Sequence, residues 1–274
     1  MRKVEKNSNS QLTKRLIACF DIVGGRVTKA MRFQDNIDVA PAWELAEVMY
    51  EAQIDELVFY DITASAEKRG IDIKTVRNVA RRIFVPFTVG GGIKDVSDMY
   101  EALKAGAEKI SVDSMAVRNP KIIEDGAKAF GSQCIVLSTQ VKRTERMPSG
   151  YEVYIDGARE ATGMDAIEWI KRGQELGAGE ICVNSIDNDG MLSGYDLDLM
   201  RLAESAVTVP IIASGGAGKP EHLKALFTQT SVQAAIISSM LYSPRMERNY
   251  TVSELKQYLA ENNVEVRPRR VTGE

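Results

Sequence analysis

The sequence is poor in the residue types on which several large classes of sites depend. Its 274 residues include one histidine, His222, and three cysteines, Cys19, Cys134 and Cys182. A single histidine cannot build a histidine-rich metal site and makes a Ser/His catalytic triad a poor explanation. The cysteines lie in apolar strand-like runs without a CxxC pair, which favours buried free thiols in a reducing cytoplasm. We therefore expect chemistry that rests on carboxylates, without a metal or a cofactor.

Long hydrophobic runs and a strong net charge are also missing. No apolar run reaches the roughly 18 residues that a membrane-spanning helix needs, and the N-terminal stretch MRKVEKNSNSQ lacks the apolar core of a signal peptide. The net charge of −3 argues against a general nucleic-acid or membrane-surface binder. With 44% hydrophobic and 27% charged residues, the composition is ordinary for a soluble globular protein, which we expect in the cytoplasm.

Short apolar runs typical of strands alternate with helical patterns along almost the whole chain. They cover residues 15–22, 55–63, 86–93, 109–114, 134–139, 180–187, 210–218 and 234–239. Eight such runs with intervening helices predict a single (β/α)8 barrel. A doubly wound open sheet is the alternative, but the GxGxxG expected after its first strand is absent.

The two halves of the chain resemble each other at a constant spacing. Five residues recur 124 positions later, as from 56 to 180: Glu56, Pro86, Gly91, Gly92 and Ser114 match Glu180, Pro210, Gly215, Gly216 and Ser238. The first strands of the two halves align at an offset of 119, which pairs Asp21 with Gln140. The repeat predicts two fused half-barrels with matching groups on opposite sides of one site.

The ends of the predicted strands carry the residues suited to chemistry, because active sites of such barrels lie at the C-terminal ends of the strands. Asp21 closes the first strand as a candidate general acid or base, with a turn-forming aspartate as the alternative. The glycine pairs, with Ser114, Ser238 and Ser239, predict two phosphate sites. An elongated substrate with a phosphate at each end would span them.

Four charged residues mark the opposite, N-terminal ends of the strands: Arg15, Glu56, Lys109 and Glu180. Alternating charges there predict a ring that closes the lower mouth of the barrel. On physical grounds alone, a structural ion-pair plug is the favoured interpretation.

Several motifs resemble those of the cyclase subunit of imidazole glycerol phosphate synthase, from histidine biosynthesis. They are ACFDI, GGRVTKAMRFQ, DELVFYDITAS, PFTVGGGI, FGSQCIVLS, LGAGEI, SIDNDG, SGYD and PIIASGGAG, in this order. The resemblance covers roughly residues 14–267. We therefore expect a barrel over 14–267, a disordered extension over 1–13 and a flexible tail over 268–274.

The resemblance implies a bis-phosphorylated formimino-aminoimidazole-carboxamide ribonucleotide as substrate, and imidazole glycerol phosphate and aminoimidazole carboxamide ribotide as products. It implies that Asp21 and Lys29 take part in catalysis. Gly91, Gly92, Asp113 and Ser114 fall in or beside one phosphate site, and Asp189, Gly190, Gly215, Gly216, Ser238 and Ser239 fall in or beside the other. Ammonia would come through the barrel from a glutaminase subunit docked at the N-terminal face, which makes the four bottom charges a gate.

The chain also departs from the family. Gln140 stands where the resemblance expects a second catalytic aspartate, and Asp113 stands in place of an asparagine; Gly24, Ala30 and Gln233 differ too. An amide cannot transfer a proton near neutral pH, and losing one acid–base group costs on the order of 10²–10⁴ in rate. We therefore expect slow turnover with ligand binding largely kept, and an Asp113 charge that weakens the first phosphate site.

Other interpretations stay open at this stage. The chain is a working cyclase that relies chiefly on Asp21, a disabled variant, or a diverged paralogue that passes ammonia to another reaction. A non-catalytic scaffold that activates a glutaminase is a further hypothesis. The sister isomerase of the same pathway shares the half-barrel plan, but the first two strand motifs are those of the cyclase.

Overall fold

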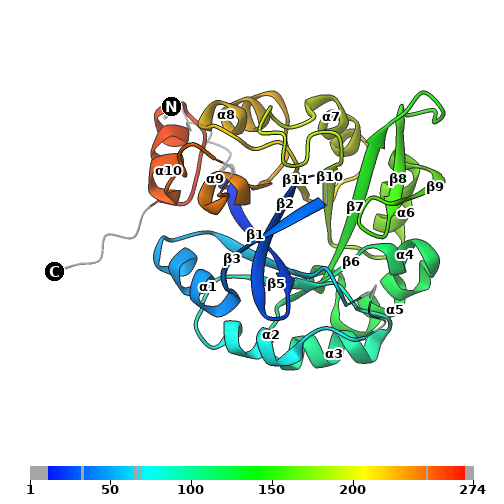
Figure 1. Ribbon diagram of the computed structural model, residues 1–274. Coiled ribbons are helices and arrows are strands. Elements are labelled where there is room, and N and C mark those ends of the chain that lie inside the picture. The colour runs from blue at the N-terminus through cyan, green and yellow to red at the C-terminus, as the bar shows by residue number, and fades with distance from the viewer. Residues whose placement is uncertain (1–11, 32–33, 65–66, 68, 245, 269–274) are drawn as a thin grey trace, which may run out of the picture.

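A closed barrel of parallel strands forms the centre of the molecule (Figure 1). The computed structural model describes residues 12–31, 34–64, 67, 69–244 and 246–268. The barrel strands, in their order around the barrel, are β1 (Arg15–Val23), β4 (Glu56–Asp61), β5 (Phe87–Gly90), β6 (Lys109–Val112), β7 (Ile135–Arg143), β10 (Glu180–Ser185), β11 (Ile211–Ser214) and β12 (Ala234–Ile236). β12 pairs back onto β1 and closes the circle. The eight predicted strands and the (β/α)8 barrel are confirmed.

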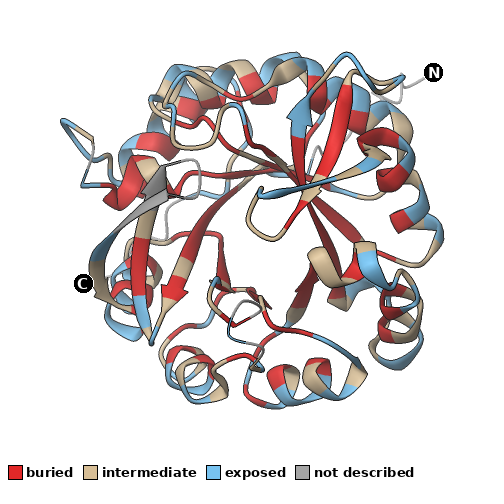
Figure 2. Cartoon of the chain, turned by 45° about the vertical axis from the view of Figure 1, so that its right-hand side comes forward, coloured by how far each residue is buried: buried red, intermediate tan, exposed pale blue. Residues whose placement is uncertain are grey.

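Helices surround the barrel and turn their buried faces toward it (Figure 2). They are α1 (Ala42–Glu51), α2 (Ile73–Ala80), α3 (Val96–Lys104), α4 (Ser114–Arg118), α5 (Lys121–Phe130), α6 (Ala166–Glu175), α7 (Leu197–Ala206), α8 (Pro220–Gln229), α9 (Ser238–Tyr242) and α10 (Val252–Glu261), with a 3₁₀ turn, η1 (Ser132–Cys134). Side-chain caps set several of their starts. Thr251 and Glu254 form a capping box at α10, for example, which satisfies backbone N–H groups that a helix leaves unpaired.

The duplication is visible in both topology and register. β1 continues into an antiparallel hairpin, β2 (Arg26–Met31) and β3 (Gln34–Pro41), and β7 continues into another, β8 (Tyr151–Ile155) and β9 (Glu160–Asp165). Ile17 pairs with Glu56 between β1 and β4, and Val136 pairs with Glu180 between β7 and β10. These pairs differ by the two offsets found in the sequence, 119 and 124. The barrel is therefore built from two equivalent halves.

The period of two along a strand sorts the interior of the barrel into layers. On β1, Leu16, Ala18, Phe20 and Ile22 pack outward against the helices in the main core. Ile17 and Cys19 face inward and join a separate interior cluster with Val58, Val136, Cys182, Ile212, Ala234 and Ile236. The same alternation leaves Arg15 at the lower mouth and Asp21 at the upper one. One strand thus supplies a residue to each end of the barrel and an apolar layer between them.

The remaining expectations concern the two ends of the chain, the cysteines, membrane spans and metal sites. Most of the predicted N-terminal extension and C-terminal tail lies outside the described residues, and Lys14 and Val266 pair in an isolated bridge where the barrel begins and ends. The three cysteines are free thiols; Cys19 and Cys182 are buried as expected, whereas Cys134 is only partly buried. Among the described residues, no helix is long and apolar enough to cross a membrane. The same residues include no group of three or more histidine, cysteine or acidic side chains placed to hold a metal ion.

Candidate active site

A cavity of about 890 Å³ opens at the C-terminal ends of the barrel strands. Twelve of the thirteen residues predicted for catalysis or phosphate binding line it: Asp21, Lys29, Gly91, Asp113, Ser114, Gln140, Asp189, Gly190, Gly215, Gly216, Ser238 and Ser239. They come from both halves of the barrel. Gly92 is not among the described lining residues; it is buried, and a Cβ atom there would collide with Ala64. The structure therefore brings the predicted upper constellation together in one place.

Asp21 projects into this cavity from the end of β1, with Lys29 of the β2–β3 hairpin beside it. The Lys29 Nζ atom lies 4.0 Å from Asp21 Oδ2. Burial raises the pKa of the Asp21 carboxyl, and the Lys29 ammonium opposes this shift. A buried carboxyl with a raised pKa beside an ammonium group is suited to the role of general acid or base.

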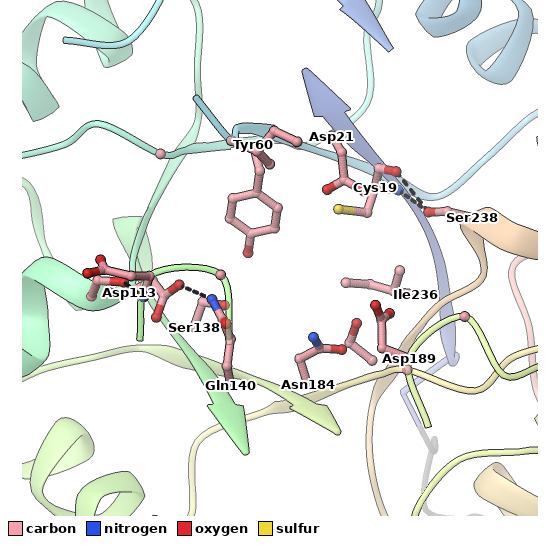
Figure 3. A pocket seen from close by; sticks show the side chains of 18 of the residues that line it. Cys19, Asp21, Tyr60, Asp113, Ser138, Gln140, Asn184, Asp189, Ile236 and Ser238 are labelled. Carbon is pink, nitrogen blue, oxygen red and sulfur yellow. Dashed lines mark hydrogen bonds between the residues drawn. The ribbon is translucent and has the colours of Figure 1, made fainter. Parts of the chain in front are cut away.

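Gln140 faces Asp21 across the cavity and is bonded to Asp113 (Figure 3). Its Nε2 atom donates a hydrogen bond to Asp113 Oδ2 at 2.6 Å. Its Oε1 atom is buried, and the described residues offer it no hydrogen-bond partner. The Asp113 carboxylate has thus turned toward the neighbouring strand β7. The Gln140 amide, which cannot itself transfer a proton, is thus hydrogen-bonded directly to the Asp113 carboxylate in the cavity wall.

Acidic groups dominate the cavity, and two more of them, besides Asp21, have a raised pKa. Burial raises the pKa of Asp113 to about 7 and that of Asp189 to about 6. For Asp189, the Lys29 ammonium opposes the shift and Asp21 reinforces it. Near neutral pH, these groups carry less negative charge than ordinary aspartates. This reduces the repulsion that an anionic ligand would meet in the cavity.

The glycine pairs lie at the ends of β5 and β11 and require their residue type. Gly91 has φ of 84° and Gly216 has φ of 103°, in the region that L-residues rarely adopt. A Cβ atom on Gly91 would collide with the carbonyl oxygen of Asp61, and one on Gly216 with that of Gly194. Close approach of other backbone therefore accounts for these glycines structurally. The same turns also present bare backbone to the cavity, as an anion site requires.

The three predicted serines differ in what their hydroxyl groups can do. Ser114 Oγ accepts a hydrogen bond from the Asp156 backbone N–H at 3.0 Å, and among the described residues its own hydrogen has no acceptor, which leaves it available to a ligand. Ser238 Oγ donates to the Cys19 carbonyl at 2.9 Å and accepts from the Cys19 N–H at 2.7 Å. Its only hydrogen is therefore committed to β1. Ser239, which also lines the cavity, is the better source of a hydroxyl donor in the second half.

At the lower mouth, the four predicted charges form a closed ring, here called the bottom ring. Lys109 Nζ bonds Glu56 Oε1 at 2.9 Å and Glu180 Oε2 at 2.8 Å. Arg15 completes the circle by bonding both of the same glutamates. The Glu56 side chain is fully buried and also accepts from Thr88. Each carboxylate thus has two cationic partners, and the alternation inferred from sequence is present.

Sequence reasoning missed other residues of the cavity wall. Tyr60 and Asn184 project into it from β4 and β10, and Arg118 pairs with Asp156 in the wall beside Asp113. The repeat contained the signal for the first two, because Asp21 pairs with Tyr60 in the same register as Gln140 pairs with Asn184. The Arg118–Asp156 pair joins α4 to the β8–β9 hairpin, and that hairpin was not predicted.

Comparison with known proteins places this arrangement in a family. A family model described as histidine biosynthesis protein matches residues 15–247. The imidazole glycerol phosphate synthase subunit HisF of Desulfosudis oleivorans is 52% identical over 259 residues, which are 93% of this chain and 98% of that protein. HisF of Desulfatibacillum aliphaticivorans is 51% identical over the same shares. HisF of Oleidesulfovibrio alaskensis is 52% identical over 251 residues, 90% of this chain and 95% of its own. With a matched family model across most of its length and relatives of this similarity, the chain belongs to the histidine biosynthesis protein family.

Proposed function

We propose that this chain is the cyclase subunit of an imidazole glycerol phosphate synthase. It uses ammonia to convert the bis-phosphorylated formimino-aminoimidazole-carboxamide ribonucleotide to imidazole glycerol phosphate and aminoimidazole carboxamide ribotide. The observation that carries this proposal is the twofold cavity: Asp21 and Lys29 lie in a space flanked by a glycine–serine site from each half. A substrate with a phosphate at each end matches that symmetry.

Each half of the barrel contributes one phosphate site. The Gly91 turn and Ser114 form the first, and the positive φ of Gly92 belongs to the same turn. The second consists of the turn at Gly215 and Gly216, the Asp189–Gly190 loop and Ser239; Ser238 anchors it to β1. A substrate held at both ends would place its reactive centre over Asp21 in the middle of the cavity. Holding two reacting groups in place in this way lowers the entropic part of a barrier.

Asp21 is the general acid–base residue of this proposal. Its carboxylate accepts a proton from the attacking nitrogen, and Lys29 stabilises the charged form from 4.0 Å. Lys29 belongs to the β2–β3 hairpin beside the cavity, so it can also contact the substrate.

The partner is a glutaminase subunit at the N-terminal face, with the bottom ring as the gate between the two proteins. Ammonia released there would pass the bottom ring and the apolar layer around Ile17 and Val136 before it reaches Asp21. The bottom ring is closed by four ion pairs, so passage requires at least one of them to open. Free ammonia supplied in solution would enter from the open cavity instead. A complex of this kind belongs in the cytoplasm.

Isotope labelling tests this function. The chain is incubated with the bis-phosphorylated ribonucleotide and ¹⁵N-ammonium, and the products are analysed by mass spectrometry. We expect equal amounts of the two products, with ¹⁵N only in imidazole glycerol phosphate. Bound substrate that persists without product, or ¹⁵N in a different compound, would favour a diverged paralogue or a scaffold instead. The rate of product formation depends on whether another residue transfers the proton that the Gln140 amide cannot transfer.

A further inference from the structure

The bond between Asp113 and Gln140 joins the ends of two neighbouring strands. Asp113 follows β6 and Gln140 lies in β7, and both line the cavity that contains Asp21. Asp113 is at the N-cap position of α4, where an aspartate usually bonds a backbone N–H of the helix, yet the described residues show no such bond for it. Its carboxylate points to Gln140 instead. Capping the helix therefore does not explain why a carboxylate is present here.

A glutamine amide suits a carboxyl group that gains and loses a proton. The amide N–H₂ donates to an ionised carboxylate, as Nε2 does here at 2.6 Å. After rotation of the amide, its oxygen accepts from the O–H of a protonated carboxyl. In the state described, that oxygen is buried and lacks a partner among the described residues. Gln140 can therefore hold Asp113 in one position through both protonation states.

The surroundings of Asp113 leave it able to change its protonation state near neutral pH. Burial is the main cause of its raised pKa, and the Asp156 carboxylate adds to the shift; the Gln140 hydrogen bond and the Arg118 guanidinium oppose it. Cys182 of β10 also senses the Asp113 charge. Asp156 and Arg118 form an ion pair at 2.5 Å, and they act on the pKa of Asp113 in opposite directions. Desolvation in the cavity wall therefore decides the balance.

We propose that Asp113 is the second acid–base catalytic residue of this chain and that Gln140 is its positioning residue. This inference rests on the proposed cyclase function. It explains two departures from the family by a single exchange. The resemblance leads us to expect an acid on β7 and an amide after β6, whereas here β7 carries the amide Gln140 and β6 is followed by the acid Asp113. The acid–amide pair itself is therefore retained. The carboxyl that position 140 lacks is provided one strand away.

Ammonia first condenses with the carbonyl group of the substrate, and the carbonyl oxygen leaves as water. The ring closure that follows then moves one proton at each of two nitrogens. Asp21, as a carboxylate, takes one proton from the attacking nitrogen. Asp113, as a carboxylic acid, gives one proton to the nitrogen that leaves when the C–N bond to the aminoimidazole product breaks. Solvent then removes the proton from Asp21 and returns one to Asp113. The turnover expected from this pair of carboxyls is that of a competent enzyme, which revises the slow rate inferred from Gln140 alone.

Asp113→Asn is the first test, because it removes the acid without changing the size of the side chain. We expect kcat to fall by about 10²–10⁴, the contribution of one acid–base group, with little change in KM. In the native chain, kcat should also fall as the pH rises through about 7, where Asp113 loses its proton. Asp113→Asn should lack this limb of the pH profile.

Two variants of Gln140 separate catalysis from a structural role. Gln140→Leu removes the bond that lowers the pKa of Asp113, so the limb near pH 7 should move to higher pH. The double variant Asp113→Asn/Gln140→Glu returns the acid to β7 and the amide to β6 at unchanged side-chain lengths. It should recover at least tenfold in kcat over Asp113→Asn alone. Loss of a purely structural contact would produce neither the shift nor the recovery.

The outcomes also separate this inference from the function on which it rests. A native chain that binds the ribonucleotide and never turns it over overturns both. An active native chain whose kcat and pH profile are unchanged in Asp113→Asn overturns only the role of Asp113. A large loss of kcat that keeps the limb near pH 7, with no recovery in the double variant, also overturns it.

Discussion

Substitution of Lys109 in the bottom ring should lower the free energy of unfolding. The ion pairs and the exposure of Lys109 set limits on the size of this loss. The ammonium group holds Glu56 at 2.9 Å and Glu180 at 2.8 Å, and the two carboxylate side chains are 0% and 7% exposed. Removing one partner of a buried ion pair costs about 3–5 kcal/mol, because the other charge stays buried. Lys109 is itself 20% exposed, and Arg15 still bonds both glutamates. We therefore expect the lower end, about 3 kcal/mol, for Lys109→Met.

Urea unfolding followed by circular dichroism measures this loss, and the chain offers matched controls. Lys109→Arg keeps the positive charge and should unfold near the native midpoint. Lys109→Met/Glu180→Gln removes one charge of each sign and leaves the Arg15–Glu56 pair, so it should be more stable than Lys109→Met alone. The reasoning is refuted if Lys109→Met unfolds at the native midpoint, or if the double variant is less stable than the single one.

Four further predictions follow from the site. Gly216→Ala should weaken inorganic phosphate binding at least tenfold in calorimetry, because its Cβ would strike Gly194, whereas Gly150→Ala has a similar positive φ in open space and should bind normally. Lys109→Glu should lower the fraction of hydrolysed glutamine whose ammonia reaches the cyclase product, and unchanged coupling to a bound glutaminase would return the bottom ring to a structural plug. Asp113→Asn should unfold at a higher temperature than the native chain at pH 8, because the folded native chain must keep ionised a carboxyl whose pKa is raised to about 7. Well below pH 4, where Asp113 is protonated in both the folded and the unfolded chain, this difference should vanish. Phosphate titration of the native chain should show weaker binding at Ser114 than at Ser239, and equal affinities would mean that the bond to Gln140 removes the influence of Asp113.

Much of the fold followed from local patterns in the sequence. The apolar runs around Ile17 and Val136 are short and strongly periodic, and parallel strands buried on both faces produce such runs. The constant offset between Glu56 and Glu180 also predicted the topology, because the strands of two duplicated halves pair in the same register. The β2–β3 and β8–β9 hairpins were missed because β2 and β9 are polar and because pairing with the ends of β1 and β7 determines both hairpins.

The site was predictable in its membership but not in its hydrogen bonding. Positions at strand ends brought Asp21, Asp113 and Gln140 to one cavity, since parallel strands end at the same edge. The Asp113–Gln140 bond depends on side-chain direction across two strands, which no spacing encodes. For the same reason, the sequence suggested a free hydroxyl on Ser238, whereas the structure commits that hydroxyl to Cys19. Pairing between strands decides what each polar group can still offer a ligand.

The most direct test of the cyclase function is the rate at which the native chain consumes the bis-phosphorylated ribonucleotide at saturating ammonium. The loss of ultraviolet absorbance is followed at pH 7 for the native chain and for Asp21→Asn, after substrate binding by both has been measured. We predict saturable turnover by the native chain that depends on ammonium, and at least a hundredfold lower kcat for Asp21→Asn with binding retained. Tight binding without turnover by the native chain, or equal rates for the two proteins, would contradict the account.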